Sequence, residues 1–247
     1  MYSWKTIRTF CVLLLILPLI HLIVLISQET IANLDGSPEV WQDQVDRYAE
    51  ADRTMSLPES PVVVIGGRHI SLWRDLESIT APKPLLARPL GDATVDDLIY
   101  HYDRLVGFYR PGAVVLLPGN GEFQVRDRKS AKVLFQRIKA LVTLDAEHNS
   151  SRRFYVIPPL KTPLYPSDYD KIDRLGRLLS AWATKQDTLT VLDANALLAD
   201  QDGIPLPAHF RSDGVHLNES GYLRLGLLLR EQLMGDFPQE YAATGAE

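Results

Sequence analysis

The sequence contains very little cysteine and no cluster of metal-binding side chains. Its 247 residues include one cysteine, Cys11, so neither an intramolecular disulfide nor a cysteine-based metal site can form within the chain. The six histidines do not cluster in a way that suits a metal ion. The sequence therefore predicts no metal site and no cofactor, and the stability of the fold must come from its apolar core.

The sequence also lacks an excess of basic residues, internal repeats and low-complexity tracts. Lysine and arginine together number 26 against 31 aspartates and glutamates, which gives a formal net charge of −5. This balance argues against a nucleic-acid partner, because such proteins carry a basic surface. With 46% hydrophobic and 23% charged residues, the composition suits one globular domain of ordinary size with a segment appended to it.

The appended segment is an uncharged apolar run near the start of the chain. Residues 10–26 would span about 26 Å as a helix, enough for a bilayer core with local thinning. Lys5 and Arg8 precede the run, so the positive-inside rule places residues 1–9 in the cytoplasm. We expect residues 10–27 to be a signal-anchor in the inner membrane of a bacterial-type cell, with the remaining chain exported. A cleaved signal peptide is the rival interpretation, although residues 27–36 offer no clear small-x-small cleavage site.

The exported part divides into three regions. Residues 28–60 read as a stalk, in which residues 40–53 form a short amphipathic helix and prolines end it. Residues 61–236 hold alternating strand and helix patterns, and residues 237–247 read as a tail. The strand patterns lie at residues 61–67, 84–90, 113–119, 152–160 and 189–195, and the one at residues 113–119 is an unbroken apolar run.

The alternation predicts the fold class. Strands that are apolar throughout are typical of a parallel sheet covered by helices on both faces. We therefore expect a three-layer α/β/α domain of the flavodoxin-like type with a five-stranded parallel sheet. Such folds place their sites at the carboxyl ends of the strands. Residues 66–69, 91–94 and 119–122 follow three of the strands and should meet there, and a loop carrying Asp213 and His216 should reach them.

These segments resemble the SGNH, or GDSL-type, hydrolase superfamily over residues 61–233. The resemblance implies hydrolysis of carboxylic esters, including acetyl groups on carbohydrates. It assigns Asp213 and His216 to the catalytic relay and Gly91 to the oxyanion hole. In the third block, Gly121 falls on the oxyanion asparagine and Asn120 stands one place early. Glu122 falls on the aspartate that follows in the family pattern.

The first block departs most from the family pattern. Gly66 matches its first glycine, Gly67 replaces the usual aspartate or serine, and Arg68 falls on the nucleophilic serine. A guanidinium stays protonated and has no lone pair to offer, so arginine cannot attack an ester. With the asparagine also replaced at Gly121, the resemblance implies a hydrolase fold that is catalytically degenerate.

Alternatives remain open at this point. His216 and Asp213 could serve an active esterase, or carbohydrate acetyl-esterase, that uses water or another hydroxyl. A binding protein could instead hold an ester, an acetylated glycan or a small anion, or act as an envelope assembly factor. Arg68 itself is expected either to pair with Asp213 or to hold an anion at the start of a helix. Glu122 is expected to be a loop carboxylate bound by nearby N–H groups.

Overall fold

The computed structural model describes residue 14 and residues 16–21, 37–124, 128–148 and 150–242. It divides into two compact units, Met1–Val40 and Trp41–Glu247. Most of the expected membrane anchor, residues 10–27, lies outside the described residues, although Leu14 and residues 16–21 are helical. Among the residues that are described, none of the helices combines the length and apolar character needed to cross a membrane.

Five parallel strands form one sheet in the second unit. They are β1 (Val62–Gly66), β2 (Leu85–Pro89), β3 (Ala113–Leu117), β4 (Arg153–Val156) and β5 (Leu189–Val191). Their order across the sheet is β2-β1-β3-β4-β5, and every neighbouring pair is parallel. This order confirms the predicted five-stranded flavodoxin-like sheet.

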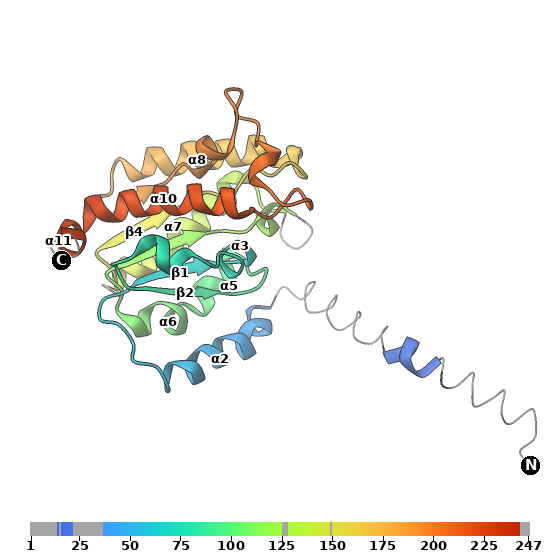
Figure 1. Cartoon of the computed structure of the whole chain (residues 1–247), viewed down its shortest axis with the longest axis horizontal. Helices are drawn as coiled ribbons and strands as arrows, with labels where there is room; N and C mark the ends of the chain where they lie inside the picture. Colours follow the sequence, from blue (N-terminus) through green and yellow to red (C-terminus); the bar gives the residue numbers. More distant parts are fainter. Residues whose placement is uncertain (1–13, 15, 22–36, 125–127, 149, 243–247) are drawn as a thin grey trace, which may run out of the picture. The chain divides into compact units, whose positions relative to one another are not determined.

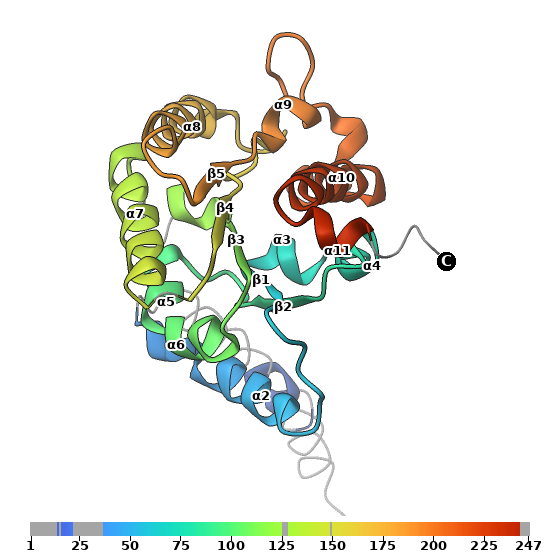
Figure 2. The ribbon, with the colours of Figure 1, turned by 90° about the vertical axis from the view of Figure 1, so that its left-hand side faces the viewer.

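Helices cover the sheet on two sides (Figures 1 and 2). One layer holds α2 (Gln42–Asp52), α5 (Val95–Tyr100), α6 (Tyr102–Leu105), α7 (Ala131–Glu147) and α8 (Tyr169–Ala183). The other holds α3 (Arg68–Ser71), α4 (Leu76–Thr80), α9 (Ala194–Leu198), α10 (Glu219–Asp236) and α11 (Pro238–Ala242). The remaining elements are short 3-10 turns: η1 (Pro38–Trp41), η2 (Gly107–Tyr109), η3 (Asn120–Phe123), η4 (Pro166–Asp168) and η5 (Pro207–His209).

The two layers arise from the period-2 geometry of the strands. Val63 and Ile65 point into the core shared with α5 and α7, whereas Val62 and Val64 point into the core shared with α10. All four side chains are fully buried. Because each face of β1 must meet a helix layer, its sequence is apolar throughout, which is the pattern from which the strand was predicted.

The compact unit begins at Trp41, well before the expected domain boundary at residue 61. The helix α2 was expected in a stalk, but its Val45 side chain is buried in the core. Asp52 at its end forms an ion pair of 2.6 Å with Arg88 of β2, and both side chains are almost fully buried. The predicted helix over residues 40–53 therefore exists, and its apolar and acidic residues serve the domain.

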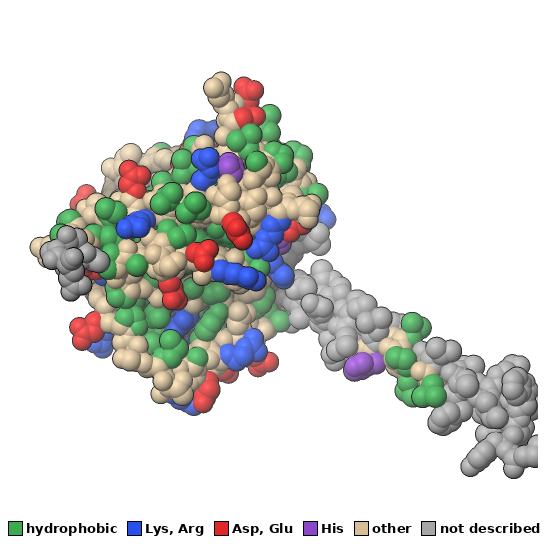
Figure 3. Space-filling model, viewed as in Figure 1, with side chains coloured by type: hydrophobic (Ala, Val, Ile, Leu, Met, Phe, Trp, Pro, Cys, Tyr) green, Lys and Arg blue, Asp and Glu red, His purple; other side chains and the backbone are tan. Residues whose placement is uncertain are grey.

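The end of the chain also packs on the domain further than expected. Residues 237–247 were expected to be a tail, but Phe237 is buried and Tyr241 donates a hydrogen bond to the carbonyl of Thr80. Lys83 forms an ion pair of 2.8 Å with Glu240. On the face shown in Figure 3, basic and acidic side chains of this unit are interspersed among hydrophobic ones.

Candidate functional site

Arg68 leaves the sheet at the carboxyl end of β1. Gly66 ends the strand with φ +152°, and a Cβ there would stand 2.1 Å from the carbonyl oxygen of Leu117 on β3. Only glycine fits this combination of left-handed backbone and close approach. Gly67 precedes the first turn of α3, and a Cβ there would lie 3.0 Å from the carbonyl oxygen of Gly91. The two glycines therefore bring Arg68 to the position that the resemblance gives to the nucleophile.

The guanidinium of Arg68 binds the carboxylate of Asp92 through two bonds. Nε lies 3.1 Å from Oδ1 and Nη2 lies 2.8 Å from Oδ2. About half of each side chain is exposed, 55% for Arg68 and 50% for Asp92. We expected the partner to be Asp213. Asp92 takes that place because it follows the end of β2, the strand beside β1 in the sheet.

Asp213 and His216 form the expected dyad. The Nδ1 atom of His216 lies 2.8 Å from Oδ2 of Asp213, while Oδ1 accepts the backbone N–H groups of Val215 and His216. Partial burial opposes the charged form, but these hydrogen bonds outweigh it and lower the pKa of Asp213 to about 2. The carboxylate is thus ionised at neutral pH and requires the proton on Nδ1. The Nε2 atom of a neutral His216 then carries a free lone pair.

A second histidine lies beside the dyad. The ring of His69 is 5.6 Å from that of His216, and the His69 side chain is buried with its Nδ1 atom lacking a hydrogen-bond partner. Burial, followed by the repulsion from His216, lowers the pKa of His69 to about 4. His69 is therefore neutral at physiological pH. The sequence placed His69 within residues 66–69 at the end of a strand but assigned it no role, because a histidine after a strand carries no signal of its own.

The N–H group assigned to the oxyanion hole already has a partner. The backbone N–H of Gly91 donates to Oε1 of Gln44 over 3.3 Å, and the Nε2 atom of Gln44 donates to the carbonyl of Pro89 over 2.9 Å. The ring of Trp41 fills the space beside Gly91, since a Cβ there would meet it at 2.4 Å. Trp41 and Gln44 were missed because their segment was assigned to the stalk. The aromatic residues of this amphipathic helix, Trp41 and Tyr48, were the available signal.

The third block places its two candidate residues differently. Asn120 is buried, and its Nδ2 atom donates to Oγ1 of Thr162 over 3.4 Å while its Oδ1 atom has no partner. Gly121 has room for a side chain, because only the carbonyl oxygen of Asp92 comes within 4.0 Å of where its Cβ would stand. An asparagine at Gly121 would therefore fit next to the Arg68–Asp92 pair. Thr162 gave no signal in the sequence.

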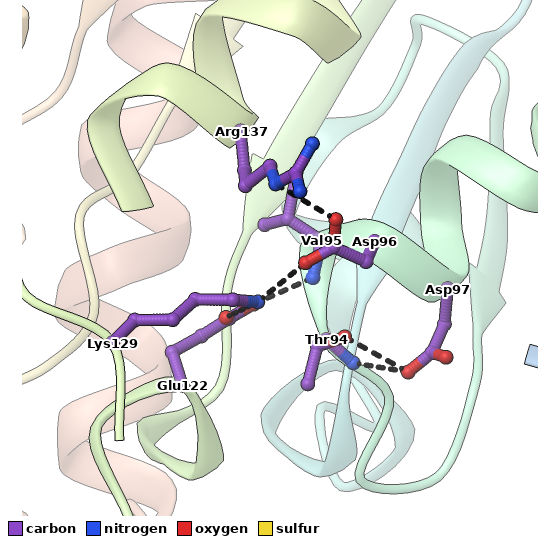
Figure 4. A network of polar contacts seen from close by, with 7 residues as sticks. All are labelled: Thr94, Val95, Asp96, Asp97, Glu122, Lys129 and Arg137. Atoms are coloured by element: carbon purple, nitrogen blue, oxygen red, sulfur yellow. Dashed lines mark hydrogen bonds and ion pairs between the residues drawn. The ribbon is translucent and has the colours of Figure 1, made fainter. Parts of the chain in front are cut away.

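Glu122 has a structural environment, as expected (Figure 4). Its Oε1 atom accepts the backbone N–H of Val95 over 2.5 Å, and its Oε2 atom lies 2.7 Å from Nζ of Lys129. Lys129 also binds Asp96, which in turn binds Arg137. Because the buried Glu122 binds both Lys129 and the N–H of Val95, it fastens η3 to the start of α5 and holds the loop that carries Asn120 and Gly121.

The comparisons with known proteins identify the fold. No protein-family model matches the sequence, and no curated protein matches it. Solved structures do match. A protein from Bacteroides fragilis proposed to be an acylhydrolase is 19% identical with a TM-score of 0.67, covering 77% of this chain and 96% of its own. A GDSL-like lipase from Bacteroides thetaiotaomicron is 16% identical with a TM-score of 0.64, covering 78% and 98%.

A third match is a catalytic mutant of an acetylxylan esterase from Geobacillus stearothermophilus, 12% identical with a TM-score of 0.57, covering 72% of this chain and 96% of its own. Together these structures show that the chain has the fold of the SGNH/GDSL-type hydrolases, as its sequence segments predicted. At these identities the fold alone is shown, so the chemistry must be argued from the residues at the carboxyl ends of the strands.

Proposed function

We propose that this chain is a catalytically degenerate SGNH-fold protein that binds a ligand at the carboxyl edge of its sheet and does not hydrolyse esters through a serine. The observation that carries the proposal is the Arg68–Asp92 pair at the nucleophile position. Acyl transfer needs an oxygen nucleophile beside a general base, and arginine supplies none. Two further observations support the proposal. The N–H of Gly91 already donates to Gln44, so it is occupied as an oxyanion donor, and the glycine at position 121 has no side chain that could donate.

The test is a stepwise restoration of the missing groups. The unaltered protein should not hydrolyse p-nitrophenyl acetate faster than His216→Ala, and a fluorophosphonate should label no serine. Arg68→Ser should introduce weak activity, and adding Gly121→Asn should raise it. Adding Gln44→Ala should raise it again, because each oxyanion donor is worth about 10²–10³ in kcat.

Arg68→Ala is the matched control, since it removes the ion pair without supplying a hydroxyl, and it should stay inactive. Stoichiometric labelling of a serine in the unaltered protein, lost in His216→Ala, would refute the proposed degeneracy. Activity that is present in the unaltered protein and indifferent to Arg68 would show that the first block has been assigned to the wrong position.

A second candidate function rests on the intact dyad. The 2.8 Å contact between Asp213 and His216 leaves Nε2 able to accept a proton from water. In this alternative the chain is an esterase, or an acetyl-esterase acting on carbohydrates, that uses water directly. It predicts slow hydrolysis of an acetylated sugar that disappears in His216→Ala and continues in the presence of the fluorophosphonate.

We also propose that residues 10–27 anchor the chain in the inner membrane and that the domain is exported. The uncharged run after Lys5 and Arg8 supports this orientation. A reporter that is active only in the cytoplasm should be silent when it is fused after Glu247. Activity of that fusion would reverse the topology, and a soluble form processed near Ala32 would replace the anchor by a cleaved signal.

A further inference from the structure

The sheet has two edge strands, and side chains close one of them. The backbone groups of alternate residues in a strand point to opposite edges. The even-numbered residues of β2 bond to β1, so the groups of Ala87 and Pro89 point away from the sheet. The carbonyl of Ala87 accepts Nη1 of Arg88, and the carbonyl of Pro89 accepts Nε2 of Gln44 over 2.9 Å. Proline also has no N–H to offer, so this edge of the sheet does not invite another strand.

The opposite edge, formed by β5, keeps its bonding groups. The carbonyl of Thr188 and the N–H of Leu192 bond to β4, so the N–H and carbonyl groups of Leu189 and Val191 point outward. Within the part of the chain that the structure describes, no hydrogen bond engages these outward groups. Figure 2 shows β5 beside α8, at the end of the sheet away from β2 and α2. An edge strand of this kind is a template for pairing with a further strand.

A groove of about 400 Å³ adjoins this edge. Val191 lines it from β5, Asp193 from the residues that follow the strand, and Gly176 from α8. Nothing lies within 4 Å of where a Cβ of Gly176 would stand, so the groove has room for side chains of an added strand. In the sheet, β3 and β4 separate β5 from β1, which precedes Arg68. Three strand spacings of about 4.8 Å each therefore separate this groove from that strand, and it is distinct from the candidate site.

The charges beside β5 disfavour a second copy of the chain as the added strand. A two-fold axis would pair β5 with itself in the antiparallel sense. The register that uses all of the outward groups places Leu189 opposite Val191. It also places Asp187 opposite Asp193, and both of these residues are exposed. Like charges directly opposite each other destabilise a strand pair, so a different partner is favoured.

The side chains beside the edge indicate the chemistry of that partner. Asp187, Leu189, Val191 and Asp193 stand two residues apart, so they share one face of the sheet. The two apolar members contact the core formed with α7 and α8. An added strand would therefore match this face with apolar residues at two alternate positions and a basic residue at the next position on each side.

The other charges that line the groove leave this preference in place. Asp173 and Arg177 both line it from α8 and have opposite charges. Asp173 is also paired with Lys161 over 2.8 Å. The carboxylate of Asp193 accepts the N–H of Ala196 and is otherwise exposed, so it can receive a basic side chain at its end of the groove.

We propose that the open edge of β5 and its groove bind an extended segment of a partner protein by strand addition. In such binding, backbone hydrogen bonds supply affinity and alternate side chains supply specificity. The segment carries two apolar residues at alternate positions, flanked by basic residues that meet Asp187 and Asp193. This inference goes beyond the ligand site at the carboxyl edge and holds whether or not the dyad cleaves an ester.

The test measures fluorescence anisotropy of labelled peptides with the full-length protein in mild detergent. The probe is the capped heptapeptide Lys-Thr-Val-Thr-Val-Thr-Lys, which should bind saturably. Replacing both lysines by glutamate should weaken binding by about tenfold or more, because two attractive pairs become repulsive. Replacing both valines by proline removes the N–H groups that would bond to β5, so this peptide should not bind saturably.

Variants of the protein locate the binding. Gly176→Leu fills open space in the groove and should abolish binding of the lysine peptide. Gly235→Leu is the matched control, since Gly235 also lies in a helix with nothing within 4 Å of its Cβ position, and it should bind normally. Asp187→Asn combined with Asp193→Asn keeps a cap for Ala196 and should bring the lysine and glutamate peptides to similar affinities. Thermal melts establish that each variant is folded.

Failure of the lysine peptide to bind, or equal binding of the lysine and proline peptides, would overturn the inference. Unchanged binding by folded Gly176→Leu would do the same. The peptide series and the aspartate variant decide the question even where Gly176→Leu does not fold. Sedimentation velocity tests the other occupant. A dimer of the unaltered protein that becomes a monomer in Gly176→Leu and not in Gly235→Leu would show that a second copy covers this edge, and the proposed partner would be wrong.

Discussion

The ion pair between Asp52 and Arg88 tests whether α2 is an integral part of the domain. The two charged groups lie 2.6 Å apart with side-chain exposures of only 5% and 9%. Arg88 Nε also donates to the hydroxyl of Tyr109 over 2.7 Å, and that hydroxyl donates to Asp52. The guanidinium lies over the rings of Tyr48 and Tyr109. Removing the carboxylate would leave a buried cation and a buried hydroxyl without their acceptor.

Asp52→Ala should therefore be strongly destabilising. Breaking a buried ion pair from one side costs about 3–5 kcal/mol, because the remaining charge stays buried and unpaired. In a domain of this size each kcal/mol lowers Tm by about 2–4 °C, so the expected decrease is roughly 6–20 °C. Urea unfolding of the full-length protein, followed by circular dichroism, should show the same loss as a lower midpoint with an unchanged slope.

The same helix supplies the control. Glu50 pairs with Arg53 at the surface, with side-chain exposures of 69% and 73%. Glu50→Ala should therefore cost less than about 1 kcal/mol. Replacing Arg88 by Met in the Asp52→Ala background should recover much of the loss, since the buried charge is removed. If Asp52→Ala is no more destabilising than Glu50→Ala, then α2 does not hold the domain together, and the role given to Gln44 falls with it.

Two further predictions concern the site. Burial lowers the pKa of His69 from 6.5 to about 4. Between these two pH values the unfolded chain binds a proton that the folded domain does not. The free energy of unfolding should therefore decrease by as much as about 3 kcal/mol as the pH falls through this window. When urea unfolding is measured over this pH range, the stability of His69→Gln should depend less on pH than that of the unaltered protein. An equal dependence on pH in the two proteins would contradict the lowered pKa of His69. Gly66→Ala should lower the free energy of unfolding by more than about 3 kcal/mol, because its Cβ would meet the carbonyl oxygen of Leu117. Gly176 lies in α8 with open space around it, so Gly176→Ala should be neutral or stabilising when it is measured in the same way.

The sequence predicted those parts of the fold that depend on local patterns. The apolar runs gave all five strands, and the parallel order followed from their alternation with helices. The spacing of Thr94 and Asp97 is that of a capping box, and the structure contains this box at the start of α5. Asn218 likewise caps α10 through the N–H of Gly221. Caps and buried strands are local features, so their residues carry the information within a few positions.

Pairings between distant segments could not be predicted in the same way. The helical period of residues 42–52 indicates an apolar face but not the surface on which it packs, so α2 was assigned to a stalk. The contact of Gln44 with Gly91 and the pair between Arg68 and Asp92 join segments brought together only by the sheet order. The helical segment after β1 is also divided into α3 and α4, and Trp73 in the break between them packs against Tyr222.

The presence of Asp213 and His216 at the site has a structural explanation that does not require catalysis. Asp213 accepts the N–H groups of Val215 and His216 in addition to the ring of His216, so its carboxylate shapes the turn that contains Gly214 at φ +65°. That turn is held to the segment after β4 by the bond from Leu164. Since the dyad stabilises this loop whether or not an ester is cleaved, its presence does not by itself argue for hydrolysis. The proposed degeneracy rests instead on the groups that would serve only acyl transfer: Arg68 offers no nucleophilic hydroxyl, Gly121 has no side-chain donor, and the N–H of Gly91 is bound to Gln44.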